Sequence, residues 1–236
     1  MMKYVLYGLF FCLFTQTAKA QLFSKERLAN LETFDNRFLS WGYYLGFNQY
    51  DFKIEYDNQI TDQTTDIEVE TQPGFNVGLI GDMRINKYMN LRLEPGIYFT
   101  TRNLYFPGFE EERDRKREVK STYIHVPLLL KLSTKRLNNF KPFIVVGISQ
   151  SINLGSNEKN PEDNFEGQFR MTNRTGYYEL GFGVDLYLFY FKFTPSIRGV
   201  FATSDELVPD DDPSSPWTGN ISSLQTRGVF LNFTFQ

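Results

Sequence analysis

Large apolar residues alternate with small or polar residues in about eight segments of the chain. In the first segment, every second residue from Trp41 to Phe47 is large and apolar, and the residues between them include Gly42 and Gly46. A period of two is typical of β-strands that have one apolar and one polar face. We therefore predict strands at 41–48, 75–85, 91–99, 123–132, 143–151, 178–186, 191–201 and 226–236. The fifth of these is so uniformly apolar that the pattern does not show which residues share a face.

The connections between these segments alternate in length. Short turns at about 86–88, 133–141 and 188–189 alternate with long polar connections at about 51–73, 103–120, 153–175 and 203–223. This rhythm is typical of outer-membrane barrels, which have short periplasmic turns and long outer loops. A soluble barrel of the lipocalin type is the alternative, and its apolar face would point inward around a ligand.

Charged residues on the small-or-polar face distinguish these two kinds of barrel. A soluble core buries charges only at a large cost in free energy, whereas charges inside a narrow membrane barrel can pair with one another and with trapped water. We predict an interior charge network of Asp82, Arg84, Arg92, Glu94, His125, Lys131, Glu179, Asp185, Lys192 and Arg198. Counting back from the turns at 86–88 and 188–189 sets opposite charges across from each other in three pairs: Asp82 with Arg92, Asp185 with Lys192, and Glu179 with Arg198.

The predicted fold class is therefore all-β, an eight-stranded antiparallel transmembrane β-barrel of the outer-membrane type with a short periplasmic N-terminal lead-in. Side chains just fill the interior of such a barrel, so we expect no aqueous pore. The last strand carries a pattern that resembles the signal read by the barrel-assembly machinery. We expect contact with that machinery during insertion through Gly228, Leu231, Phe233 and Phe235. The inserted barrel is expected to contact outer-membrane lipid.

The first twenty residues have the features of an export signal. Lys3 precedes an apolar stretch of about eleven residues, which is too short to cross a hydrocarbon core of roughly 30 Å as a helix. The small residues Ala18 and Ala20 then suit cleavage. We therefore expect a signal peptide at 1–20, a periplasmic lead-in at 21–39 and the eight-stranded barrel at 40–236, with both termini of the mature chain in the periplasm. In the lead-in, Leu28, Leu31 and Phe34 have helical spacing.

The charge balance argues against a nucleic-acid partner, and the cysteine content excludes disulfides and thiolate metal sites. The chain has 25 Lys and Arg against 28 Asp and Glu, which offers no basic surface for a nucleic acid. Its single cysteine, Cys12, lies in the expected signal peptide. The mature chain therefore has neither a disulfide nor a thiolate metal site.

Residue patterns for catalysis or metal binding are weak. The single histidine, His125, shares a strand face with Tyr123 and Lys131. Some eight-stranded barrels modify lipid A with a histidine and a serine or an acid, but we interpret His125 as a member of the interior network. The acidic groups in the third and last long connections lack the spacing of an EF-hand loop: Glu158, Glu162, Asp163, Glu166 and Asp210–Asp212. We expect no enzymatic activity, no catalytic residue, no cofactor and no metal. The charged run at 110–118 is expected to form a mobile outer loop.

Three N-terminal segments carry a family resemblance. The residues N-L-E-T-F-D at 30–35, W-G-Y-Y-L-G-F-N at 41–48 and Y-D-F-K at 50–53 resemble the PorT family of the Bacteroidetes, also called SprT in gliding species. The segments at 123–131 and 141–143 resemble a strand pair of the wider barrel superfamily. The resemblance implies a non-enzymatic component of the type IX secretion system, required for protein export and gliding.

The resemblance does not supply a mechanism, because an eight-stranded barrel is too narrow to be the conduit for folded cargo. Our hypothesis is an assembly or accessory role through protein–protein contacts. The candidate partner-contact residues lie in the resembling segments: Phe34, Asp35, Trp41, Phe47, Asn48, Asp51 and Phe52. Two alternatives remain open, namely a stand-alone structural or adhesive barrel like OmpA or OmpX, and a lipid-A-modifying outer-membrane enzyme.

Overall fold

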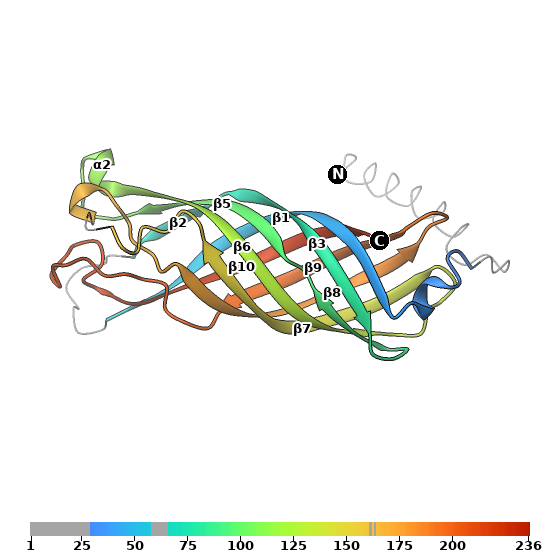
Figure 1. Ribbon diagram of the computed structural model, residues 1–236. Coiled ribbons are helices and arrows are strands. Elements are labelled where there is room, and N and C mark those ends of the chain that lie inside the picture. The colour runs from blue at the N-terminus through green and yellow to red at the C-terminus, as the bar shows by residue number, and fades with distance from the viewer. Residues whose placement is uncertain (1–28, 58–65, 161, 163) are drawn as a thin grey trace, which may run out of the picture.

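The segments with a period of two form a closed ring of antiparallel strands (Figure 1). The structure is a computed structural model, which describes residues 29–57, 66–160, 162 and 164–236. Strand β1 pairs with both β3 and β10, which closes the ring. The strands are β1 (Leu39–Tyr56), β2 (Glu68–Thr71), β3 (Pro73–Arg84), β4 (Met89–Leu93), β5 (Gly96–Tyr105), β6 (Lys116–Ser133), β7 (Phe140–Asn153), β8 (Arg174–Tyr187), β9 (Lys192–Ala202) and β10 (Ile221–Phe235).

Ten strands occupy eight positions in the ring. Gln72 alone separates β2 from β3, and Glu94 and Pro95 separate β4 from β5. Pro95 interrupts its strand because it has no N–H to donate to the ladder. Its carbonyl oxygen still accepts the N–H of Leu79 at 2.9 Å, so the pairing continues across the gap. The predicted eight-stranded all-β barrel is confirmed.

Large apolar side chains point outward from the ring, and polar side chains point inward. On β1, Trp41 and Phe47 are 69 % and 59 % exposed, whereas Tyr44 between them and Asn48 after them are buried. The structure also shows which residues of β7 share a face. Ile144 points outward and is exposed, whereas Phe143 and Val145 point inward and are buried. The outward apolar side chains on the other strands include Leu79, Leu93, Ile97, Leu128, Leu180, Phe182, Ile197 and Leu231.

The outward apolar face covers only part of the length of the barrel. On β1 it ends at Phe47, and Asp51 and Lys53 are among the outward residues that follow. Strands β1 and β6 each have 18 residues, whereas about 9–11 residues cross a membrane. We call the part with apolar outward residues the apolar band, which includes 41–47 of β1, 124–132 of β6 and 229–235 of β10. We call the rest, with the long connections, the extension.

The short turns and the C-terminus lie at one end of the barrel, and the long connections lie at the other end with α2 (Glu112–Arg115) (Figure 1). The expected loops at 51–73 and 103–120 are wrong in extent, because β1 continues to Tyr56 and β6 begins at Lys116. The charged run at 110–118 is thus partly strand and partly the helical turn α2. Within the described residues, no helix is long and apolar enough to cross a membrane.

The expected turn at 188–189 is also wrong, and with it the register of two charge pairs. Strands β8 and β9 pair Tyr187 with Lys192, so the turn has four residues, closed by an N–H···O bond of 3.0 Å from Leu188 to Phe191. Two-residue hairpin turns favour Gly, Asn or Asp, and Leu-Phe offers none of these. Asp185 therefore lies two residues out of register with Lys192, as a diagonal neighbour on the same face rather than directly across from it. Glu179 has the same diagonal relation to Arg198. The pairing of Asp82 directly across from Arg92 is confirmed.

Candidate functional site in the barrel interior

Within the apolar band, the interior contains paired charges. Arg92 on β4 binds Asp82 on β3 with an Nη2–Oδ2 distance of 2.6 Å, and Lys131 on β6 binds Asp185 on β8 with an Nζ–Oδ2 distance of 2.5 Å. Both cations also lie over the ring of Phe143, with Lys131 Nζ 4.1 Å from its centroid. All of these side chains are buried, so the pairs link the strands where the barrel is surrounded by apolar side chains.

A second chain of polar contacts crosses the interior nearer the middle of the barrel. Arg198 on β9 contacts Glu94 at 2.8 Å and Glu179 at 2.9 Å. The other carboxylate oxygen of Glu179 lies 2.8 Å from His125 Nε2, and His125 Nδ1 lies 2.6 Å from Ser151 Oγ. If Nε2–H donates to the carboxylate and Nδ1 carries no proton, Nδ1 accepts a hydrogen bond from the Ser151 hydroxyl.

Ser151, His125 and Glu179 have the connectivity of a hydrolase triad, in which an acid orients a histidine that activates a serine. Here, however, His125 and Glu179 are 0 % exposed and Ser151 is 1 % exposed. The rings of Tyr98 and Phe230 pack against His125 with centroid distances of 4.9 Å and 5.8 Å. As arranged, Ser151 Oγ is closed to a lipid substrate, and the three residues tie β6, β7 and β8 together.

A layer of aromatic side chains follows above this chain of contacts, toward the long connections. Its buried members are Tyr44, Tyr50, Tyr98, Tyr123, Tyr177 and Phe230, together with Val200 and Ala202. Arg102 donates to Tyr123 Oη at 2.8 Å and lies 3.8 Å from the ring centroid of Phe52. This layer fills the cross-section of the barrel with rings.

Glu206, in the connection after β9, lies buried above the aromatic layer. Its carboxylate accepts the hydroxyls of Tyr177 at 3.2 Å and Thr226 at 2.7 Å. Burial raises the pKa of Glu206, while the positive charge of Arg102 opposes that rise. Glu206 thus links the connection between β9 and β10 to the inner wall of the barrel.

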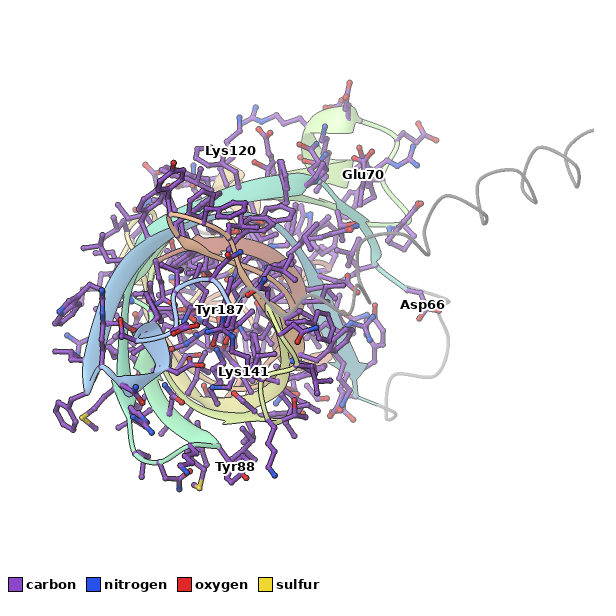
Figure 2. All side chains as sticks on the ribbon, turned by 90° about the vertical axis from the view of Figure 1, so that its right-hand side faces the viewer. Asp66, Glu70, Tyr88, Lys120, Lys141 and Tyr187 are labelled. Carbon is purple, nitrogen blue, oxygen red and sulfur yellow. The ribbon has the colours of Figure 1, made fainter. Side chains whose placement is uncertain are left out.

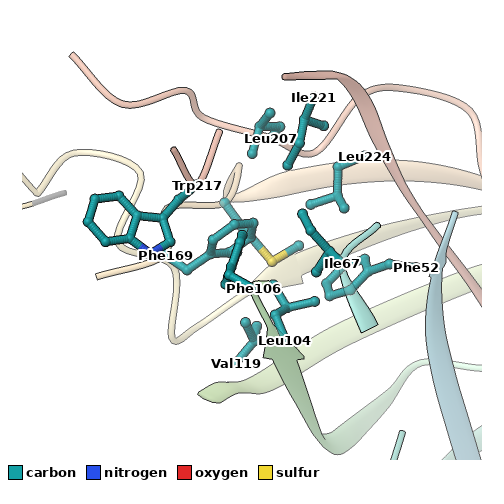
Figure 3. Close-up of a cluster of buried hydrophobic side chains, with 11 residues drawn as sticks. Phe52, Ile67, Leu104, Phe106, Val119, Phe169, Leu207, Trp217, Ile221 and Leu224 are labelled. Atoms are coloured by element: carbon teal, nitrogen blue, oxygen red, sulfur yellow. The ribbon is translucent and has the colours of Figure 1, made fainter. Parts of the chain in front are cut away.

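The interior of the extension contains an apolar cluster. A cluster of buried side chains there combines strand residues with residues of the long connections (Figure 3): Phe52, Ile67, Leu104, Phe106, Val119, Phe169, Met171, Leu207, Trp217, Ile221 and Leu224. Trp217 stacks on Phe109 with 5.0 Å between ring centroids and donates its Nε1–H to the carbonyl oxygen of Asp114 at 2.9 Å. The long connections therefore pack as a hydrophobic core over the mouth of the barrel.

Buried polar contacts also tie the long connections together. Asp210 accepts hydrogen bonds from Asn164 Nδ2 at 3.0 Å and Ser215 Oγ at 2.5 Å, and Arg117 donates to the Asn164 carbonyl oxygen at 2.8 Å. The neighbouring Asp211 binds Arg170 at 3.0 Å. The described residues contain no cluster of three or more His, Cys, Asp or Glu that could hold a metal ion.

At the opposite mouth, the segment before β1 lies against the barrel. Asp35 accepts the Tyr187 hydroxyl at 2.6 Å, and Asn30 donates its side-chain amide to the Tyr187 carbonyl oxygen at 3.0 Å. Phe34 is buried and meets the Tyr187 ring edge-on. Viewed onto this end, Tyr187 and Lys141 lie within the ring of strands (Figure 2). The expected signal peptide and residues 21–28 lie outside the described residues.

The structure brings nine of the ten expected network residues together as buried side chains, and the tenth, Arg84, is half-buried at the short-turn mouth. Arg102, Lys141 and Glu206 are buried charges that the sequence reasoning did not include. Arg102 lies four residues after the inward-facing Tyr98, so it points to the same face of β5. Extending the predicted strand beyond Phe99 with the same alternation identifies it as an inward residue. Nothing in the local sequence marks Glu206, because its burial depends on tertiary packing.

The seven candidate partner-contact residues do not form one surface. Phe34 and Asp35 contact the barrel mouth, as described above. Asn48 and Phe52 are buried inside the barrel, and Trp41, Phe47 and Asp51 lie on its outer side, where Asp51 binds Arg227 at 2.7 Å.

The residues of the expected assembly signal lie on β10. Gly228 faces inward opposite Tyr50, and a Cβ atom there would come within 3.2 Å of the Tyr50 ring. Leu231, Phe233 and Phe235 alternate with the buried Asn232 and Thr234, so their side chains point outward.

Comparison with known proteins places these observations in context. Residues 17–208 match the family described as "Outer membrane protein beta-barrel domain". No curated protein matches the chain.

Three solved structures of outer-membrane proteins are similar to this chain. OprG from Pseudomonas aeruginosa is 13 % identical, with 83 % of this chain and 94 % of that chain covered and a TM-score of 0.44. Neisserial surface protein A is 9 % identical, with 83 % and 97 % covered and a TM-score of 0.43. Ail of Yersinia pestis is 14 % identical, with 83 % and 96 % covered and a TM-score of 0.38.

Proposed function

This chain belongs to the outer membrane protein β-barrel domain family, and from that premise we propose that it is a non-conducting, non-enzymatic accessory or assembly component of the type IX protein secretion system. It acts through protein–protein contacts and supports protein export and gliding. Its signal peptide, residues 1–20, is removed on export, and the barrel-assembly machinery inserts the barrel through the signal in β10. The short-turn end and both termini lie in the periplasm, and the extension lies outside the cell.

The observation that carries this proposal is the filled interior. Paired charges, a layer of aromatic rings and the hydrophobic cluster of the extension follow one another along the barrel, and the segment at Asn30–Asp35 lies against the other mouth. An eight-stranded barrel filled in this way does not pass a folded protein. A role in secretion must therefore be exerted through its surfaces rather than through its lumen.

The sequence resemblance at 30–35, 41–48 and 50–53 supports assignment to the type IX system rather than to secretion in general. The packed extension favours a second candidate, a stand-alone adhesive barrel, because it presents a formed surface to the outside of the cell. The lipid-A-modifying alternative has no comparable support, since Ser151 and His125 are both closed to lipid.

Deletion of the gene, followed by measurement of type IX cargo in the culture medium and of gliding, tests the proposal. We expect deletion to abolish both export and gliding, and complementation by the wild type to restore them. Complementation by His125→Gln should restore them as well, because the proposed role needs no catalytic imidazole and the Gln amide can still form hydrogen bonds. Normal export together with lost cell adhesion would favour the adhesive barrel. A change in lipid A that depends on His125 would favour the enzyme.

The filled interior makes a separate prediction for the purified protein. Reconstituted in a planar lipid bilayer, the refolded barrel is expected to give no discrete conductance steps in salt solution. The matched control is a variant with residues 29–36 deleted, which opens the short-turn mouth and removes Asp35. It leaves the ion pairs of Asp82, Asp185 and Glu179 and the aromatic layer in place, and it too is expected to be silent. Stable conductance from the wild type would contradict a non-conducting role.

A further inference from the structure

The short-turn mouth of the barrel contains a cavity of about 510 Å³, within the size range of small-molecule sites. The segment before β1, the turn between β3 and β4, and the ends of β3, β7 and β9 contribute to its lining. Seven of the lining side chains are basic and two are acidic. The cavity is therefore strongly positive, although the whole chain has a net charge of −3.

Both acidic side chains of the cavity already have partners. Asp82 binds Arg92 at 2.6 Å and accepts Asn90 Nδ2 at 2.5 Å. Asp35 accepts the Tyr187 hydroxyl at 2.6 Å and lies 3.6 Å from Lys141. The two carboxylates offset only part of the positive charge of the seven basic side chains, and Asp82 is already paired with Arg92, which is not among the lining residues.

Five more cations line the cavity: Arg37, Lys87 and Lys135 are exposed at its rim, Arg84 is half-buried and Lys192 is buried. Among the residues that the structure describes, none of these five has a carboxylate oxygen within 4.0 Å. Like charges gathered around one cavity repel each other, and an anion bound between them would relieve that repulsion.

Lys192 shows most clearly that the cavity is a formed site. It is only 4 % exposed, and within the described part of the chain its Nζ donates no hydrogen bond, while it lies 4.6 Å from the ring centroid of Phe34. The carboxylate of Asp185 faces it but is occupied by Lys131 at 2.5 Å and by the Thr194 hydroxyl at 2.8 Å. The Lys192 ammonium opens onto the cavity, where a ligand oxygen can accept a charge-assisted hydrogen bond from it.

We propose that this cavity binds a small ligand through a phosphate group. A phosphate places two negative charges on one compact centre, which matches several cations around a cavity of this size better than a single carboxylate does. The guanidinium groups of Arg37 and Arg84 can bind phosphate oxygens in pairs, and Lys192 supplies a point charge at the base. The same group could arrive on a soluble phosphate compound or on a lipid headgroup. The site is independent of any role in secretion.

Calorimetric titration of the mature chain in a neutral detergent tests this proposal. The probes are pyrophosphate, inorganic phosphate, dihexanoyl phosphatidic acid, citrate as a tricarboxylate of similar size, and a hexaglutamate peptide. We expect the phosphate probes to bind, with citrate and the peptide at least about tenfold weaker. Tighter binding of phosphatidic acid than of pyrophosphate would identify a lipid source, and the reverse order a soluble source.

Three variants locate the binding. Lys192→Gln and Arg84→Gln are each expected to weaken pyrophosphate at least about tenfold, the effect of losing one charge-assisted hydrogen bond. Lys120→Gln, on an exposed side chain of the extension, is expected to leave it unchanged. Arg84 is half-buried at the rim, so its variant reports on binding even where Lys192→Gln fails to fold.

Absence of phosphate binding would overturn the proposal, as would equal affinity for citrate, tighter binding of the peptide, or affinity that Arg84→Gln leaves unchanged. These outcomes are separate from those of the secretion assay, because they are measured on the purified protein.

Discussion

The apolar band and the extension are built in opposite ways along the same strands. In the band, the outward side chains are apolar, such as Leu45 and Phe47, and the interior holds charges such as Arg198 and Glu179. In the extension, the outward side chains include Asp51 and Lys53, and the interior holds the cluster around Trp217. Strand β1 passes through both regions without a break in its alternation.

The difference follows from the solvent outside each region. In the band, the outward apolar side chains lie in lipid, so the hydrophobic effect does not favour moving them into the interior. The interior of the band is instead held together by ion pairs and hydrogen bonds. Water surrounds the extension, so burial of apolar side chains inside it is favourable by roughly 25 cal/mol per Å². One barrel therefore combines the organisation of a membrane protein with that of a soluble domain.

The largest expected effect comes from removing a charge inside the band. Arg198→Ala leaves the buried carboxylate of Glu179 without a guanidinium partner and that of Glu94 with only the longer contact of 3.4 Å to Arg92, which should cost about 3–5 kcal/mol of unfolding free energy. Urea unfolding in detergent, followed by fluorescence, measures this cost.

Arg227→Ala is the matched control, because it removes an arginine whose pair with Asp51 lies on the outside and is half exposed. It should cost no more than about 1 kcal/mol. Equal costs for the two variants would contradict a structural role for the interior charges.

A smaller and more local effect is expected in the extension. Trp217→Ala opens a cavity in the hydrophobic cluster at a cost of about 3 kcal/mol. The long connections should become sensitive to protease while the band remains folded. Limited proteolysis with mass spectrometry locates the cuts, and the chain's other tryptophan supplies the control, since Trp41→Ala at an outward position should leave the pattern unchanged. Loss of the whole barrel in Trp217→Ala would show that the two regions fold as one unit.

The smallest expected effect concerns Glu206, where the two regions meet. Burial raises its pKa, so the folded state favours the protonated carboxyl. The protonated carboxyl of Glu206 contributes fully to the stability of the fold at a pH below the usual glutamate pKa. This contribution is lost as the pH rises through the raised pKa of Glu206 in the folded state. Glu206→Gln should therefore be more stable than the wild type at pH 7, and thermal melts should show this advantage shrinking as the pH falls toward 4.

Asp212→Asn provides a control of opposite sign, because hydrogen bonds from Ser214 lower the pKa of the exposed Asp212 carboxyl. A Glu206→Gln advantage that grows toward low pH would contradict burial as the cause.

The sequence predicts the band better than the extension. Alternation with large outward side chains marks the eight strands, and the inward charges such as Asp82 and Arg92 follow from it. In the extension the outward residues are polar, so the pattern predicts loops for the part of β1 from Asp51 onward and for the part of β6 up to Lys120. The cluster joins residues as distant as Phe52 and Trp217, and no local pattern shows that they meet.

The turn between β8 and β9 shows the same limit, because charge matching at Asp185 and Lys192 favoured a turn whose residues lack the required backbone preference. The interior positions were correct, because a shift of two residues keeps every side chain on its face.

The two tryptophans allow the most direct test of the division into band and extension, because Trp41 lies outward in the band and Trp217 lies within the cluster. We would measure tryptophan fluorescence in vesicles that contain lipids brominated on the acyl chains, using Trp217→Phe to observe Trp41 and Trp41→Phe to observe Trp217. The account predicts strong quenching of Trp41 and almost none of Trp217. Equal quenching of both, or stronger quenching of Trp217, would contradict it.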